Sequence, residues 1–246
     1  MRLAEPPVTL LNGASLFLDF DGTLVALAQT PDSVEVDLEL IDLLKRIQSK
    51  LEGRVAVLSG RALADVRDRL ERVSLAIGGS HGLERAPAGG ADKVAQRPPG
   101  LEAAIRELRQ VETRHPGVIV EEKPLGVALH YRLAPDAETD CHDAAGRAAA
   151  AIGMALQFGK MVVELKPPDG DKGKALHHFM SESPFKDGRP LFVGDDLTDE
   201  HGFVAARELG GIGVLVGPER ATAAQFRLAD VGAVRRWLQA ACESLP

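Results

Sequence analysis

Residues 16–24 read LFLDFDGTL, and this stretch decides the fold of the chain. Its apolar run ends in two acids and a glycine, which is typical of a strand that is buried on both faces and presents carboxylates at its carboxyl end. Side chains alternate along a strand, so Asp19 and Asp21 are expected on the same side, and Gly22 allows a sharp turn after them. Taken alone, such a pair is more often a turn or a helix cap. Otherwise two neighbouring carboxylates share a proton or hold a cation, which makes them candidates for metal binding, for acid/base chemistry or for both.

Length and composition exclude several classes of protein. The chain has 246 residues, more than the roughly 150 of a typical domain, so one large or two unequal domains are expected. Its net charge of −7 argues against a nucleic-acid partner, and an anionic substrate would need a local cation cluster or a metal. Cys141 and Cys242 lack ligand spacing and fit a reducing compartment. Because no apolar stretch approaches the roughly 18 residues of a membrane span, we expect a cytoplasmic protein with no membrane partner. We also expect a monomer.

Strand and helix patterns alternate on both sides of a central insertion. Before it, apolar runs at residues 54–58 and 75–77 follow the first strand, and each ends in small or polar residues. After it, apolar runs at residues 190–193 and 212–216 are separated by a helical pattern. Such alternation predicts an α/β fold whose core is a doubly wound, mostly parallel sheet with its ligand site along one edge.

The central insertion has a different pattern. Residues 86–100 are rich in Ala, Gly and Pro without periodicity, as expected of a linker. Helical patterns at residues 101–114 and 137–151 are each followed by two short strand patterns, which predicts a small α+β layer. We expect residues 99–165 to form this layer as an inserted cap domain for substrate specificity, and residues 1–98 and 166–246 to form the catalytic core.

A second acidic group follows the buried run at residues 190–193. Asp195, Asp196 and Asp199 come after it, so a parallel sheet brings as many as five carboxylates to one edge. Such a cluster is costly without a cation. Two or three carboxylates with no softer ligand favour Mg²⁺.

Two further residues are expected at the same edge. Ser59 ends the second strand and offers a hydroxyl beside the backbone N–H of Gly60, and Lys172 opens a helix. Both can hold a transferring phosphate. A metal-bound carboxylate beside a second acid suits phosphoryl transfer, so this edge predicts a phosphate-handling site.

The combined motifs resemble the haloacid dehalogenase superfamily of aspartate-nucleophile phosphatases. More specific segments resemble the trehalose-phosphatase family: VLSGR (57–61), GSHGLE (79–84), VEEK (120–123), ALHYR (128–132), VELKP (163–167), DKG (171–173) and GDDLTDE (194–200). The resemblance runs from about residue 16 to about residue 216. It implies a haloacid dehalogenase-like core with an α+β cap, and Mg²⁺-dependent hydrolysis of the sugar phosphate trehalose 6-phosphate through an aspartyl phosphate.

The resemblance also implies roles for the core residues. Asp19 attacks phosphorus, and Asp21 protonates the leaving sugar oxygen and then activates water. Asp195, the Asp19 side chain and the Asp21 backbone carbonyl hold Mg²⁺. The residues that bind the phosphate or orient the groups around it are Ser59, Lys172 and Asp199.

Substrate contacts are implied for a larger set of residues. They are Gly22, Arg61, His81 and Glu84 in the core, and Glu121, Lys123, His130, Arg132, Glu164 and Lys166 in the cap. Strand alternation pairs Glu121 with Lys123 and His130 with Arg132 on one face, where acids and bases together can bond sugar hydroxyls. The alternative is a solvated, salt-bridged sheet face. We expect the cap to close over the core before phosphate transfer.

Other functions fit parts of this pattern. The substrate can be another sugar phosphate, such as sucrose phosphate or mannosylglycerate phosphate. A different class is a non-catalytic phosphosugar-binding module or a receiver-like signalling domain, since receivers also phosphorylate an Asp beside acidic metal ligands. A receiver needs neither the insertion nor a second carboxylate two residues after the nucleophile, so Asp21 and the insertion favour the enzyme.

Overall fold

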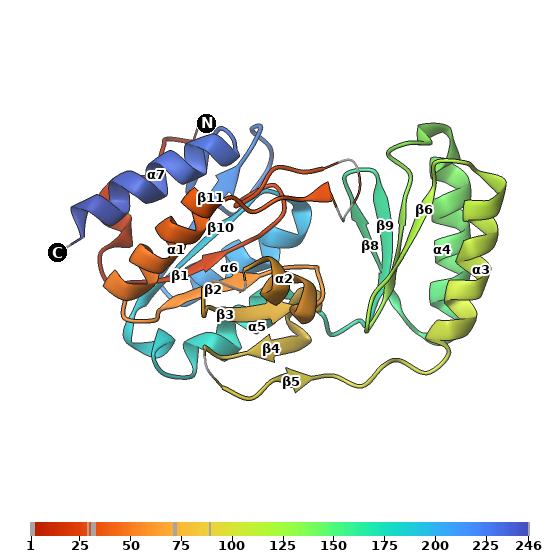
Figure 1. Ribbon diagram of the computed structural model, residues 1–246, viewed down its shortest axis with the longest axis horizontal. Helices are drawn as coiled ribbons and strands as arrows, with labels where there is room; N and C mark the ends of the chain where they lie inside the picture. The colour runs from red at the N-terminus through yellow and green to blue at the C-terminus, as the bar shows by residue number, and fades with distance from the viewer. Residues whose placement is uncertain (1–2, 29, 31–32, 71–72, 89, 246) are drawn as a thin grey trace. The chain divides into compact units, whose positions relative to one another are not determined.

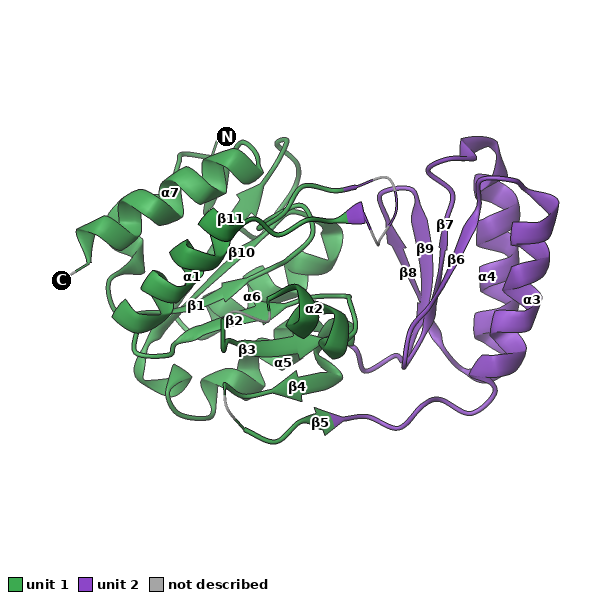
Figure 2. Cartoon of the chain, in the orientation of Figure 1, with its two compact units in different colours: residues 1–27, 34–93, 171–246 green, residues 28–33, 94–170 purple. Residues whose placement is uncertain are grey.

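A computed structural model describes residues 3–28, 30, 33–70, 73–88 and 90–245. The chain forms two compact units (Figure 2). The first comprises residues 1–27, 34–93 and 171–246, and the second residues 28–33 and 94–170. The sequence predicts boundaries at 98/99 and 165/166, whereas the main part of the second unit begins at Val94 and ends at Gly170, and the unit also takes in residues 28–33.

The first unit is built on an eight-stranded sheet. Its strands, in sheet order, are β12 (Phe226–Leu228), β11 (Ile212–Val216), β10 (Arg189–Gly194), β1 (Ala14–Leu18), β2 (Val55–Leu58), β3 (Ala76–Gly79), β4 (Glu84–Ala86) and β5 (Lys93–Val94). Neighbouring strands run parallel from β12 to β3, and β4 is antiparallel to β3. The predicted mostly parallel α/β core is therefore confirmed. The sequence does not predict β4, β5 or β12, because two or three residues are too few to show a period.

Helices cover both faces of this sheet (Figure 1). They are α1 (Leu38–Lys50) with α7 (Val231–Ser244) on one face, α5 (Lys172–Met180) with α6 (Glu200–Glu208) on the other, and the short α2 (Leu63–Arg69) between β2 and β3. Phe17 of β1 packs with Phe179 of α5 and Phe203 of α6, whereas its equally buried neighbours Leu16 and Leu18 alternate to the opposite face. Burial on both faces explains the unbroken apolar sequence of this strand.

The second unit is a four-stranded antiparallel sheet with two helices on one face (Figure 1). Its elements are β6 (Ile119–Glu122), β7 (Val127–His130), β9 (Val162–Lys166) and β8 (Ala155–Gly159) in sheet order, with α3 (Leu101–Arg114) and α4 (Glu138–Ile152). Val120, Leu129 and Val163 belong to the core that these helices cover. The alternate residues Glu121 and Glu164 both pair with Ala128 across the sheet and lie on the face opposite the helices.

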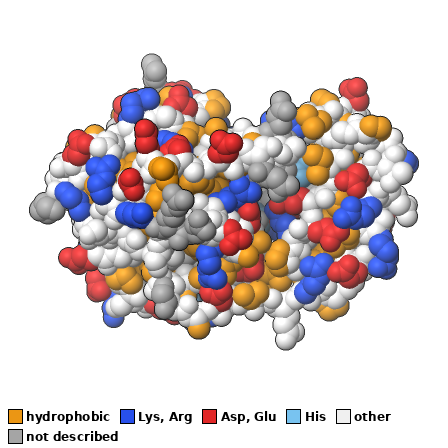
Figure 3. Space-filling view, in the orientation of Figure 1, with side chains coloured by type: hydrophobic (Ala, Val, Ile, Leu, Met, Phe, Trp, Pro, Cys, Tyr) orange, Lys and Arg blue, Asp and Glu red, His pale blue; other side chains and the backbone are white. Residues whose placement is uncertain are grey.

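Short 3-10 helices join these elements. They are η1 (Val8–Leu11), η3 (Ser80–Gly82), η4 (Pro135–Ala137), η5 (Phe185–Asp187) and η6 (Leu197–Asp199). None of the described helices has the length and apolar composition needed to cross a bilayer. Acidic and basic side chains are interspersed on the surface that Figure 3 shows. An anionic ligand must therefore be held by local cations and not by the overall field.

Candidate active site

Lys172 joins two of the predicted carboxylates at the carboxyl end of the parallel strands. Asp19 directly follows β1, Asp199 ends η6 after β10, and Lys172 is the first residue of α5. The Lys172 Nζ lies 2.6 Å from Asp19 Oδ1 and 2.6 Å from Asp199 Oδ1. Each of the three side chains is at most 6% exposed. The N-cap Asp171, which accepts two N–H groups of the first turn, fixes the point where α5 starts and hence the position of Lys172.

The charges of this triad depend on one another. Burial raises the pKa of Asp19 well above its ordinary value; Lys172 opposes this shift, while Asp199 and Asp195 add to it. Burial lowers the pKa of Lys172, but attraction to Asp19 and Asp199 outweighs burial and leaves that pKa above its ordinary value. The ammonium therefore stays charged and compensates two buried acids.

We expect Lys172→Met to destabilise the protein strongly. Removing the cation leaves Asp19 and Asp199 buried without their common partner, and breaking a buried ion pair in this way costs about 3–5 kcal/mol. Urea unfolding measures the change, with Lys174→Met, an exposed position on the same helix, as the control expected to stay within about 0.5 kcal/mol. Equal unfolding midpoints for wild type and Lys172→Met would show that the triad does not contribute this much to the free energy of unfolding.

The acidic residues at this edge fit a hard divalent cation. One carboxylate oxygen from each of Asp19, Asp195 and Asp199 lies within 4.8 Å of the others. Asp199 is already engaged, because its Oδ1 accepts from Lys172 and its Oδ2 accepts from the N–H groups of Asp195 and Asp196 at 2.8 and 2.9 Å. Asp19 and Asp195 are thus the better candidates for metal ligands. All donors are carboxylate oxygens, the type that Mg²⁺ prefers.

Gly22 shapes the same site. Its φ of +84° is the left-handed conformation that glycine adopts readily, as the sharp turn predicted after Asp21 requires. A Cβ at this position would overlap the carboxylate of Asp195. Any larger residue would therefore displace a candidate metal ligand.

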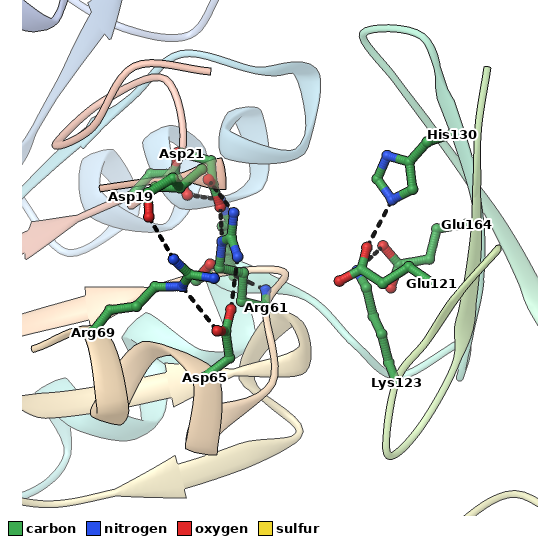
Figure 4. Close-up of polar contacts among 12 residues, drawn as sticks. Asp19, Asp21, Arg61, Asp65, Arg69, Glu121, Lys123, His130 and Glu164 are labelled. Atoms are coloured by element: carbon green, nitrogen blue, oxygen red, sulfur yellow. Dashed lines mark hydrogen bonds and ion pairs between the residues drawn. The ribbon is translucent and has the colours of Figure 1, made fainter. Parts of the chain in front are cut away.

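Asp21 has a different basic partner. Arg61 Nε lies 2.6 Å from Asp21 Oδ2, and Arg61 Nη2 lies 2.8 Å from Asp21 Oδ1, so the guanidinium forms a two-pronged contact with the carboxylate (Figure 4). The sequence predicts a shared proton or a cation for the two acids of the first motif. The structure adds a third arrangement, in which Asp19 pairs with Lys172 and Asp21 pairs with Arg61.

The loop after β2 is held by the loop after β3. Ser59 is buried; its Oγ accepts from the N–H of Arg61 at 3.1 Å, and its carbonyl accepts from the N–H of His81 at 2.9 Å. Ser80 and His81 have φ values of +47° and +57°, which is unusual for residues other than glycine and marks a tightly constrained loop. A Cβ on Gly60 would approach the His81 ring to 2.8 Å, so these loops require glycine at that contact.

Glu84 lies in the same region but its observed contacts are internal. The side chain is buried, and its Oε2 accepts from Ser80 Oγ at 2.5 Å and from the N–H of Leu63 at 3.1 Å. Glu84 therefore ties the start of α2 to the loop after β3. Its predicted contact with substrate stays a prediction.

The second unit brings four predicted residues together on the face opposite its helices (Figure 4). His130 Nε2 lies 2.7 Å from Glu121 Oε2, and Lys123 Nζ lies 2.6 Å from Glu164 Oε2. Burial raises the pKa of Glu121, but Lys123 and the hydrogen bond to His130 outweigh it, so the net pKa lies below its ordinary value. We call these four residues the polar cluster.

The other two predicted cap residues have different contacts. Arg132 follows the end of β7, and its Nη2 donates to the carbonyl of Lys160 at 2.9 Å, at the turn between β8 and β9. Lys166 is buried and donates to the carbonyl of Gly170 at 2.5 Å. Their observed contacts are therefore with backbone carbonyls at turns.

Two charged residues near Asp21 are missing from the sequence predictions. Asp65 and Arg69 lie on α2, where Asp65 contacts both Arg61 and Arg69. Residues 61, 65 and 69 carry alternating charge at a spacing of four, the spacing that brings side chains together on a helix. This spacing could have predicted the contacts of Asp65 with Arg61 and Arg69.

Comparison with known proteins agrees with this geometry. The chain is 38% identical over 225 residues to "Trehalose-6-phosphate phosphatase" of Escherichia coli (strain K12), covering 91% of this chain and 84% of that protein. The solved structure "Crystal structure of trehalose-6-phosphate phosphatase related protein" matches with a TM-score of 0.79 and 26% identity over 93% of this chain and 96% of that one. A phosphatase of the haloalkanoate (HAD) enzyme superfamily, BT1666 from Bacteroides thetaiotaomicron, has the same fold at a TM-score of 0.58 and 16% identity, over 91% of this chain and 92% of that one. The model of the trehalose-phosphatase family matches residues 17–232. The protein therefore belongs to the trehalose-phosphatase family.

Proposed function

We propose that this protein hydrolyses trehalose 6-phosphate to trehalose and inorganic phosphate. The observation that carries the proposal is the buried contact between Lys172 and Asp19 at the end of β1, beside Asp195 and Asp199. A carboxylate held by a fixed cation next to further acids suits a nucleophile that attacks phosphorus. Membership of the trehalose-phosphatase family supports the choice of substrate.

The reaction proceeds in two displacements. An oxygen of Asp19 forms a bond to phosphorus while the bond from phosphorus to the sugar oxygen breaks, and Asp21 gives its proton to that oxygen. Water then attacks phosphorus, the bond to Asp19 breaks, and Asp21 takes the proton of the water. The Lys172 ammonium balances charge on the phosphate oxygens throughout, and the Ser59 hydroxyl donates a hydrogen bond to them. Asp19, Asp195 and the backbone carbonyl of Asp21 would hold Mg²⁺, which would supply further positive charge at these oxygens.

The polar cluster supplies recognition of the sugar in this proposal. Two acids and two bases on one sheet face provide both acceptors and donors for hydroxyl groups. A sugar that lacks the matching hydroxyls would leave these groups paired only with one another and would gain fewer contacts than the right substrate. The cytoplasmic location and the monomeric state remain predictions from the sequence.

The proposed function is tested by phosphate release from a panel of sugar phosphates with and without Mg²⁺. We expect trehalose 6-phosphate to be the best substrate and chelation of divalent ions to stop the reaction, with recovery on adding Mg²⁺. Faster release from sucrose phosphate or mannosylglycerate phosphate would move the protein to another substrate. Release that is unchanged by chelation would contradict the metal assignment.

We expect Lys123→Ala to reduce kcat/KM for trehalose 6-phosphate by about 10²-fold, since it removes a donor and leaves Glu164 without this ion pair. Nitrophenyl phosphate has no sugar, so its hydrolysis should change less than about threefold. Arg109→Ala is the control, because Arg109 is an exposed cation of the same unit that pairs with Glu122 on α3's side of the sheet. Equal losses with both esters would mean that the polar cluster has a structural role only.

A further inference from the structure

Arg61 belongs to a continuous chain of charged groups that runs from Asp21 into α2 (Figure 4). Its Nε and Nη2 donate to the two oxygens of Asp21, and its Nη1 donates to Asp65 Oδ2 at 2.7 Å. Asp65 Oδ1 in turn accepts from Arg69 Nε at 2.8 Å, and Arg69 Nη1 donates to the carbonyl of Val34 at 2.6 Å. All three nitrogens of the Arg61 guanidinium therefore donate to a carboxylate.

The rest of Arg61 is also held in place. Its N–H donates to Ser59 Oγ, its carbonyl accepts from the N–H of Ser80 at 2.7 Å, and its guanidinium lies 5.7 Å from the centre of the Phe20 ring. These contacts fix the backbone and the position of the side chain. The remaining guanidinium nitrogen, Nη1, contacts Asp65, which lies four residues further along the chain.

We propose that Asp65 is a positioning residue, which fixes the guanidinium of Arg61 so that the two nitrogens facing Asp21 hold that carboxylate in one orientation. Arg69 anchors Asp65 from its other oxygen. The inference deepens the proposed function and rests on it, because orientation matters only if Asp21 exchanges protons with the sugar oxygen and with water. Such transfer needs an approach of about 2.6–3.2 Å between heavy atoms. A misplacement of about 1 Å can cost on the order of 10²-fold in rate.

The position of Asp65 separates this role from a purely structural one. Its side chain is 36% exposed, and the largely buried Arg61 keeps its two-pronged contact with Asp21 when Asp65 loses its charge. Removing its charge should therefore leave the fold intact while loosening Arg61. The observed contacts of the Arg61 guanidinium are with Asp21 and Asp65, and its predicted contact with substrate stays a prediction.

The test compares Asp65→Asn with Asp68→Asn, the same change at an exposed position of the same helix. The Asn amide has one oxygen, so it can accept from Arg61 or from Arg69 but presents an N–H to the other. We expect Asp65→Asn to lower kcat for trehalose 6-phosphate by about tenfold without changing KM. The kcat for nitrophenyl phosphate, whose leaving group needs less protonation, should fall by a smaller factor. Asp68→Asn should match the wild type with both esters.

Two further measurements make the result decisive. In an Asp21→Asn background, Asp65→Asn should cause no additional loss, because a residue that acts through Asp21 has nothing left to position. The ¹⁵N–¹H resonance of Arg61 Nε should be sharp in the wild type and in Asp68→Asn, and shifted or broadened in Asp65→Asn. Equal losses with both esters, an additional loss in the Asp21→Asn background or an unchanged Arg61 resonance would overturn the inference. If the wild type hydrolysed none of these esters, the proposed function would fail, and the resonance would still decide whether Asp65 fixes Arg61.

Discussion

Asp19→Asn is expected to reduce phosphate release from trehalose 6-phosphate by roughly 10⁴-fold or more, the scale on which loss of a nucleophile acts. The amide is nearly isosteric with the carboxylate, and its oxygen can still accept from Lys172, so the buried triad keeps its packing. It cannot form a stable bond to phosphorus. Steady-state phosphate release and trapping of the phosphorylated protein after a denaturing quench measure the effect.

The control for this change is Asp230→Asn. Asp230 is the N-cap of α7 and accepts from the N–H of Ala233 at 2.7 Å, and Asn serves equally well at such a position. Its activity and unfolding temperature should match the wild type. If Asp19→Asn retained more than about a few per cent of the wild-type rate, the covalent route through Asp19 would be wrong.

Asp21→Asn is expected to lower kcat for trehalose 6-phosphate by about 10²–10⁴-fold, the usual contribution of a general acid and base. The metal site should persist, since Asp21 is proposed to contribute its backbone carbonyl and not its side chain. With nitrophenyl phosphate, the first displacement should keep more of its rate, because nitrophenolate leaves without a proton. Single-turnover formation of the phosphorylated protein compares the two esters. A loss of the same size for both would count against a role in protonating the leaving group.

Local sequence patterns predict the strands and helix starts that frame the site. The apolar run that ends at Asp19 becomes β1 because complete burial demands continuous apolar residues, and the alternation around Glu121 and His130 places both on one face of their sheet. Lys172 opens α5 as predicted, directly after a capping acid. These features depend on periodicity and capping, which act over a few residues and are therefore readable without coordinates. The closure of the inserted unit over the core stays a prediction.

The sequence by itself thus determined which residues end the strands and which faces they occupy, whereas the tertiary structure decided their partners. Asp19 meets a lysine 153 positions away and Asp21 meets an arginine 40 positions away, so strand order and loop conformation, not local pattern, select these contacts. The same holds for Glu84, whose carboxylate turns inward to Ser80 and Leu63. A buried charge requires a partner, but the sequence alone does not show which residue the fold brings within reach of it.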